Sequence, residues 1–177
     1  LDPDDAVDAG ALWTYNGGAT WNDSGYLETR LSPGIYEINF KAVDDWISPD
    51  AVEVDLVRGE STVITGAYMQ TASLTVIIDN NTDVKTYATW SIDGGINDHG
   101  TGTRVDGLQP GLPGYDILFS DITEDVPGWD TPTAIHIELL EGEERTVTAS
   151  YTPVSGGLQV SFEASGGPAD PPSEGRW

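Results

Sequence analysis

The chain has 177 residues, enough for one large domain or two small ones. Its 30 acidic and 7 basic side chains give a formal net charge of −23. This charge excludes electrostatic binding to the phosphates of nucleic acid and disfavours docking on an anionic membrane. It has no cysteine, which excludes disulfides and thiolate chemistry, and no apolar run long enough for membrane insertion.

Short segments of alternating apolar and polar residues follow one another along the chain. We expect strands at 52–56, 74–78 and 135–139, because this alternation buries one face of a strand and leaves the other in water. Gly, Pro, Asn and Asp mark the turns between segments, at 16–18, 33–34, 58–59, 93–95, 110–111 and 141–142. No stretch has a helical period, so the sequence predicts an all-β fold.

The second half of the chain repeats the first. Aligning Trp46 with Trp129 also aligns Tyr68 with Tyr151 without a gap. Further pairs agree with this repeat: Trp13 with Trp90, Leu31 with Leu108, Tyr36 with Tyr115, Phe40 with Phe119, Val54 with Ile137 and Gly59 with Gly142. So many matching spacings indicate a tandem repeat of one structural unit.

Each repeat has the strand number and turn spacing of a small β-sandwich. We therefore predict two tandem immunoglobulin-like antiparallel β-sandwiches, at residues 1–70 and 71–153. Residues 154–177 contain the alternating segment Leu158, Val160 and Phe162, followed by a Gly/Pro-rich linker.

The repeated aromatic residues are candidates for the framework of each unit. A repeated tryptophan is expected to plug the core, and a repeated tyrosine to cover it while its hydroxyl bonds to the backbone. An exposed binding platform is the competing interpretation of the tryptophans. The framework residues are Trp13, Trp46, Tyr68, Trp90, Trp129 and Tyr151.

The motif formed by these residues resembles a bacterial immunoglobulin-like surface repeat and is similar to PEGA-type β-sandwich modules. In the first unit it consists of Gly10-Ala11-Leu12-Trp13, Gly17-Gly18, Trp21, Ser24-Gly25, Leu31, Pro33-Gly34, Tyr36, Phe40, Trp46, Pro49, Gly59 and Ala67-Tyr68. The second unit departs from it, with Ile96 in place of Trp21 and His99 in place of Ser24. The resemblance implies structure and display rather than catalysis.

The frame of the repeat is offset from the ends of the chain. Leu1 aligns with Ile78 and Phe162, each at the end of a unit's first strand, so the first strand of unit one would precede Leu1. Two interpretations remain open. In the first, the chain is one part of a longer array of repeats. In the second, Leu158, Val160 and Phe162 of one subunit complete unit one of the next subunit by donor-strand complementation, which produces a filament.

Acidic residues cluster before the tryptophan of each unit. Calcium prefers carboxylate, amide and carbonyl oxygens, and loops of acidic β-modules supply them. Neither cluster has the spacing of an EF-hand loop, so a solvated acidic surface is the competing interpretation. The candidate calcium ligands are Asp2, Asp4, Asp5, Asp8, Asp79 and Asp83. Calcium is the only cofactor that the sequence suggests.

No catalytic motif is present in the sequence, and we do not expect an enzyme. We expect an extracellular or cell-surface structural module, a spacer or filament subunit, whose partners are copies of itself or further repeats of the same chain. The alternative is a carbohydrate- or ligand-binding accessory module of a larger secreted protein, with Trp21 or Trp46 stacking on sugar rings.

Overall fold

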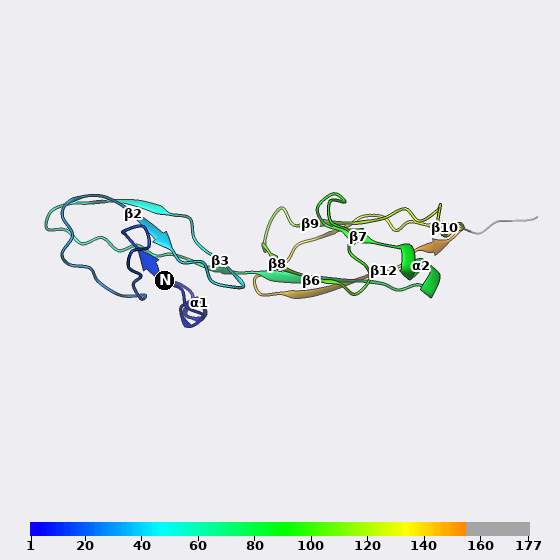
Figure 1. Ribbon diagram of the computed structural model, residues 1–177, viewed down its shortest axis with the longest axis horizontal. Coiled ribbons are helices and arrows are strands. Elements are labelled where there is room, and N and C mark those ends of the chain that lie inside the picture. Colours follow the sequence, from blue (N-terminus) through cyan, green and yellow to red (C-terminus); the bar gives the residue numbers. More distant parts are fainter. Residues whose placement is uncertain (155–177) are drawn as a thin grey trace, which may run out of the picture.

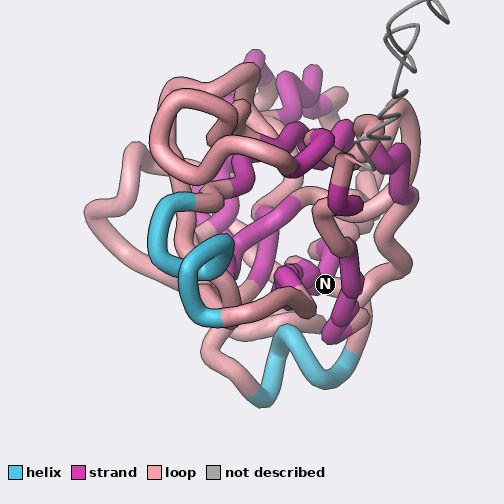
Figure 2. The backbone as a smooth tube through the Cα atoms, turned by 90° about the vertical axis from the view of Figure 1, so that its right-hand side faces the viewer, coloured by secondary structure: helices cyan, strands magenta, loops and turns pink. Residues whose placement is uncertain are grey.

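A computed structural model, which describes residues 1–154, is built from short strands and turns (Figure 1) and confirms the all-β prediction. Its helices are two short segments, α1 (Asp4–Asp8) and α2 (Thr82–Tyr87), which Figure 2 shows beside the strands in a view along the long axis. No helix among the described residues is both long and apolar enough to cross a membrane. The segment containing Leu158, Val160 and Phe162 lies outside the described residues.

The strands fall into two groups that follow one another along the molecule (Figure 1). We call residues 1–70 the N-terminal unit and residues 71–153 the C-terminal unit. The N-terminal unit contains β1 (Trp13–Thr14), β2 (Gly34–Phe40), β3 (Trp46–Ile47), β4 (Val52–Leu56) and β5 (Met69–Gln70). The C-terminal unit contains β6 (Ala72–Ile78), β7 (Trp90–Ser91), β8 (Arg104–Leu108), β9 (Tyr115–Phe119), β10 (Trp129–Asp130), β11 (Ile135–Ile137), β12 (Glu144–Ala149) and β13 (Thr152–Pro153).

The C-terminal unit is a complete two-layer structure. One sheet has the order β12-β6-β8, in which β6 is parallel to β12 and antiparallel to β8. The other has the order β11-β9-β7. Leu74, Val76 and Ile78 of β6 are fully buried against Ile117 of β9 and Trp90 of β7, so both sheets share one core. The immunoglobulin-like assignment of this architecture stays a prediction.

The N-terminal unit contains only part of this arrangement. Its sheet β1-β2-β4 corresponds to β7-β9-β11, and its pair β3-β5 corresponds to β10-β13. The registers agree as well, since Trp13 faces Phe40 as Trp90 faces Phe119. Within residues 1–154, no sheet of the N-terminal unit corresponds to β12-β6-β8.

Both helices form where the sequence predicted acidic loops. The side chain of Asn81 caps α2 by accepting a hydrogen bond from the backbone N–H of Val84 at 3.0 Å, and Asp83 lies in the first turn, where the helix dipole favours an acid. The expectation of loops was wrong because these helices are too short for a hydrophobic period, and the side-chain cap of α2 is a local signal that such a period does not show; α1 has no side-chain cap.

Candidate functional site

The indole rings of Trp13 and Trp90 are held in the same way in the two units. Trp13 Nε1 donates a hydrogen bond of 2.9 Å to the carbonyl oxygen of Asp23, and Trp90 Nε1 donates one of 3.0 Å to that of Gly100. Trp90 is fully buried, whereas Trp13 is only half-buried. The two units thus place equivalent framework residues in different degrees of contact with water.

The framework tyrosines also occupy equivalent places. Tyr68 donates its hydroxyl proton to the carbonyl oxygen of Lys41 at 2.7 Å, and Tyr151 donates its own to that of Ser120 at 2.6 Å. Burial raises the pKa of both phenols above the ordinary tyrosine value. Both tyrosines are buried, and both hydroxyls bond to the backbone.

Leu1 occupies the place at which β6 ends in the C-terminal unit. The amino group of Leu1 donates to Ser24 Oγ at 2.8 Å, and the N–H of Ile78 donates to Thr101 Oγ1 at 2.8 Å. The next residue repeats the pattern, with Asp2 N to Gly66 O at 3.0 Å and Asp79 N to Ala149 O at 2.9 Å. Leu1 and Asp2 therefore hold the places of Ile78 and Asp79 in the repeat.

The N-terminal unit has an open strand position beside Leu1. In the C-terminal unit, β6 lies between β12 and β8, and the repeat matches these two strands to residues 61–66 and 27–31. Among the described residues, neither segment belongs to a strand pair. Without a central strand the two segments have no ladder to join, so their backbone groups are available to another strand.

A groove of about 930 Å³ runs along this open position. Its floor includes Ile38 of β2 and Val54 of β4, and its walls come from residues 24–31 and 57–65. Leu27 on one wall is 66% exposed and Val63 on the other is 89% exposed. Apolar side chains therefore face water on both sides of a position that would hold a strand.

Burial differs between equivalent residues in the way an unfilled core predicts. Ile117 and Leu139 in the C-terminal unit are fully buried, while Ile38 and Leu56 at the same places in the N-terminal unit are half-buried. Among the described residues, the C-terminal core cluster contains thirteen buried residues and the N-terminal cluster three. Because burial of apolar surface is the main driving force of folding, the larger core of the C-terminal unit gives that unit the greater hydrophobic stabilisation among the described residues.

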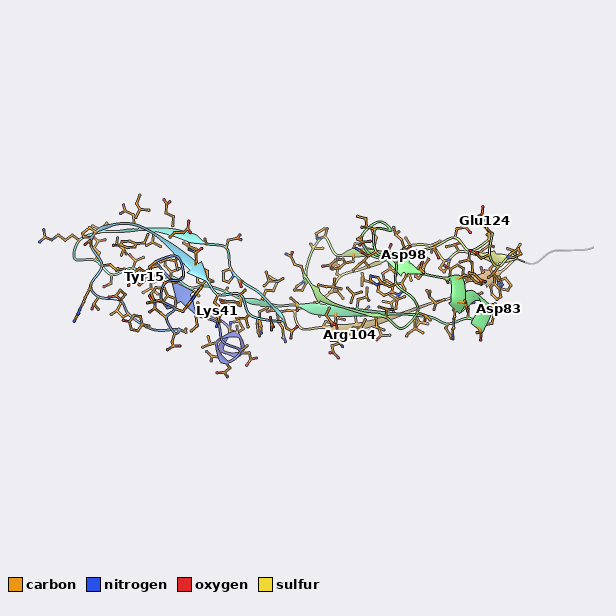
Figure 3. The ribbon with its side chains drawn as sticks, viewed as in Figure 1. Tyr15, Lys41, Asp83, Asp98, Arg104 and Glu124 are labelled. Carbon is orange, nitrogen blue, oxygen red and sulfur yellow. The ribbon has the colours of Figure 1, made fainter. Side chains whose placement is uncertain are left out.

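Aromatic rings line the groove of the N-terminal unit. Tyr15, which follows β1 and is labelled in Figure 3, lies 6.2 Å from Trp13 and 6.3 Å from Tyr36 between ring centroids, and Tyr26 lies 6.5 Å from Trp13. Desolvation, together with the nearby Glu28 carboxylate, raises the pKa of Tyr15. Sequence reasoning missed Tyr15 and Tyr26 as site residues, although alignment of 27–31 with β8 was a signal that could have located the groove.

The remaining tryptophans are divided between packing and exposure. Trp46 and Trp129 are half-buried, and each packs against the core cluster of its own unit, as expected of framework residues. Trp21 is 41% exposed, and its ring lies against Gly18. Of the two candidates for stacking on sugar rings, Trp21 is therefore the more exposed, and sugar binding stays a prediction.

The candidate calcium ligands lie in two separate units. Asp2 precedes α1, and Asp4, Asp5 and Asp8 lie in it. Asp79 precedes α2, and Asp83 lies in the first turn of α2 at the far end of the other unit (Figure 3). Asp79 is 3.9 Å from Lys85 Nζ, an exposed ion pair. Within residues 1–154, no group of three or more acidic or histidine side chains is placed to hold a metal ion. Calcium binding stays a prediction, which a melting curve with and without EDTA tests.

The backbone makes equivalent hydrogen bonds where it leaves each of the two units. The N–H of Thr71, which follows the N-terminal unit, donates to the carbonyl oxygen of Asp45 at 2.9 Å. The N–H of Val154, which follows the C-terminal unit, donates to that of Gly128 at 2.8 Å. The backbone therefore leaves the two units through equivalent hydrogen bonds, and after the N-terminal unit Thr71 leads directly into β6.

No protein-family model matches this chain, and no curated protein matches it. A solved structure titled "The Bacillus anthracis TIE protein" is similar over 80% of this chain, with 13% sequence identity and a TM-score of 0.33. The chain spans 30% of the length of that structure's chain. A likeness at this level carries no argument about fold or function, so the resemblance to PEGA-type modules stays a prediction.

Proposed function

We propose that the chain is a structural module of an extracellular or cell-surface repeat protein, a spacer or filament subunit rather than an enzyme. Its partners are copies of itself or further repeats of the same chain. One observation carries the proposal: the N-terminal unit has an open strand position although its other strand pairings match those of the C-terminal unit. An unpaired sheet edge over an apolar groove is suited to the addition of a strand from another segment.

The joint between the units supports an end-to-end arrangement. The N–H of Gln70 in β5 donates to Glu141 Oε1 of the C-terminal unit at 2.8 Å, and Thr71 Oγ1 donates to the carbonyl oxygen of Asp45 at 3.1 Å. Only Thr71 separates β5 from β6, so the linker has little freedom. Such joints, repeated from one unit to the next, give a stiff rod suitable for a spacer or a fibre.

The acidic surface fits the same role. A net charge of −23 keeps separate chains soluble and makes them repel one another, and salt screens that repulsion. At physiological or higher ionic strength, the apolar contacts at the groove therefore outweigh the repulsion between chains, and we expect the chains to assemble.

Negative-stain electron microscopy with light scattering on the same sample tests the proposal. The full chain is expected to form uniform filaments, and the chain lacking residues 156–177 is expected to stay monomeric. A monomeric full chain at high concentration would contradict the filament role, as would assembly that persists after the deletion.

A further inference from the structure

We propose that the groove of the N-terminal unit takes residues 157–161 of a second copy in one defined register, parallel to residues 61–66 and antiparallel to residues 27–31. Leu158 and Val160 of the second copy fill the groove. This inference rests on the proposed function and names its partner segment. It follows from the contacts of β6, the reach of the chain beyond Val154 and the place that Leu1 occupies.

The register follows from β6 and the internal repeat. In the parallel pair, Thr75 faces Thr146 and Val76 faces Val147. The repeat carries Thr146 and Val147 onto Val63 and Ile64, and the segment containing Leu158 and Val160 onto β6. The matching positions of the complex are Gln159 beside Val63, Val160 beside Ile64 and Ser161 beside Thr65.

The side-chain pattern of the donor segment matches the two layers it would separate. Leu74 and Val76 of β6 are fully buried, while Thr75 and Ile77 are only half-buried. The donor segment has Leu158 and Val160 at the buried positions and polar Gln159 and Ser161 at the others. A shift by one residue would turn both apolar side chains to water, so this alternation selects the register.

Leu1 limits how much of the donor segment enters the groove. Because Leu1 occupies the place of Ile78, only the positions equivalent to residues 72–77 are open. Three inward positions, those of Ala72, Leu74 and Val76, are therefore available, and Leu158 and Val160 take the last two. Phe162 falls on the position that Leu1 holds, so it lies beyond the open part of the groove.

The donor segment belongs to a second copy because the same chain cannot reach its own groove. From Val154 to Leu158 the chain spans at most about 14 Å. β6 lies between the joint and the far end of the C-terminal unit (Figure 1) and is itself about 20 Å long at about 3.3 Å per residue. The residues that line the groove all belong to the N-terminal unit, beyond the joint. Val154 leaves its unit as Thr71 does, so a second copy would follow the first as the C-terminal unit follows the N-terminal unit.

Introduced cysteines test the register in the full chain, which has no cysteine of its own. In the proposed register the Cα atoms of Val63 and Gln159 lie about 5 Å apart, within the range of a disulfide. Those of Val63 and Ser161 lie about 8 Å apart, outside that range. The double variant Val63→Cys/Gln159→Cys is therefore expected to form a ladder of disulfide-linked oligomers, at least tenfold more than the control Val63→Cys/Ser161→Cys.

The outcomes separate the inference from the proposed function. Oligomers that form by light scattering but cross-link preferentially in the control pair, or in neither pair, overturn the inference and leave the structural role standing. A chain that stays monomeric and does not cross-link overturns both the inference and the filament role. The matched variant Thr65→Cys/Ser161→Cys is expected to cross-link as well as the first pair.

Variants of the donor segment test which side chains fill the groove. Val160→Asp is expected to abolish assembly, because it places a carboxylate in an apolar position. Phe162→Ser is expected to change assembly less than threefold, and a loss as complete as that of Val160→Asp would overturn the assignment of Phe162 outside the groove.

Peptide binding tests whether the groove takes residues 157–161 or a different strand. The full-length Val160→Asp variant keeps its groove and lacks a working donor, so a peptide of residues 155–163 is expected to bind it saturably at one per chain. The same peptide carrying Val160→Asp is expected not to bind. Binding of a β6 peptide, residues 71–79, without binding of the 155–163 peptide would overturn the inference, because the groove would then be an acceptor for another strand.

Discussion

Ile38 and Ile117 form a natural pair for testing whether the groove is a missing part of a core. They occupy the same position in β2 and β9, where Ile38 faces Val52 and Ile117 faces Ile135. Ile117 is fully buried, whereas Ile38 is half-buried on the groove floor. The same substitution therefore removes a completely buried side chain in one unit and a partly hydrated one in the other.

The expected cost of each substitution follows from this burial. Truncating a fully buried isoleucine to alanine costs about 2–5 kcal/mol, so Ile117→Ala is expected to lower the free energy of unfolding of the C-terminal unit by about 3–4 kcal/mol. Ile38→Ala is expected to cost about 1–2 kcal/mol in a chain that ends at Val154, because part of the side chain is already in contact with water. In assembled full chains, where the donor covers Ile38, the cost rises toward that of Ile117→Ala.

Amide hydrogen exchange on β2 and β9 measures the opening free energy of each unit separately within one molecule. Ile117→Ala serves as the internal control, since its cost does not depend on the donor. If Ile38→Ala cost the same with and without residues 155–177, the groove would not be where the donor segment packs, and the reasoning from burial would fail.

Three further predictions concern the framework and the charge. Gly66→Ala is expected to destabilise the N-terminal unit by about 1–3 kcal/mol, because a Cβ at this position would overlap the ring of Phe40. The control Gly100→Ala has open space around its Cβ and is expected to change stability little, and denaturant titration compares the two variants. Tyr151→Phe is expected to lower the free energy of unfolding by about 1 kcal/mol, because the hydrogen bond to Ser120 is lost. Burial raises the pKa of Tyr151, so the stability linked to its protonated form is complete below about pH 10 and is lost as the pH rises through the folded-state pKa. Denaturation at alkaline pH is expected to show this loss in the parent chain and not in the variant. Raising NaCl from 0.02 to 0.5 M is expected to increase assembly in light scattering, because like charges are screened; a decrease would mean that attraction between opposite charges drives association.

The fold was predictable where local pattern and burial agree. Leu74, Val76 and Ile78 alternate in sequence, and all three are fully buried in β6. The repeat located the framework aromatics, since Trp90 and Tyr151 are core residues whose polar atoms bond to the backbone. These features depend on residues close in sequence or on spacings that recur, and both are visible without a structure.

The groove was only partly predictable. The offset of the repeat indicated that a first strand would precede Leu1, but it did not indicate which side chains that offset leaves in water. The exposure of Leu27 and Val63 depends on two segments far apart in sequence that lie beside the same open position. The alternation of Val52, Val54 and Leu56 predicts a buried face, yet Val52 and Leu56 are only half-buried in the structure.

A cryo-electron microscopy reconstruction of the assembled full chain tests the central claim most directly. The account predicts a strand of a neighbouring copy between residues 27–31 and 61–66, parallel to the latter, with Leu158 and Val160 directed at Ile38 and Val54. An assembly held together through another surface, with this position empty, would contradict it.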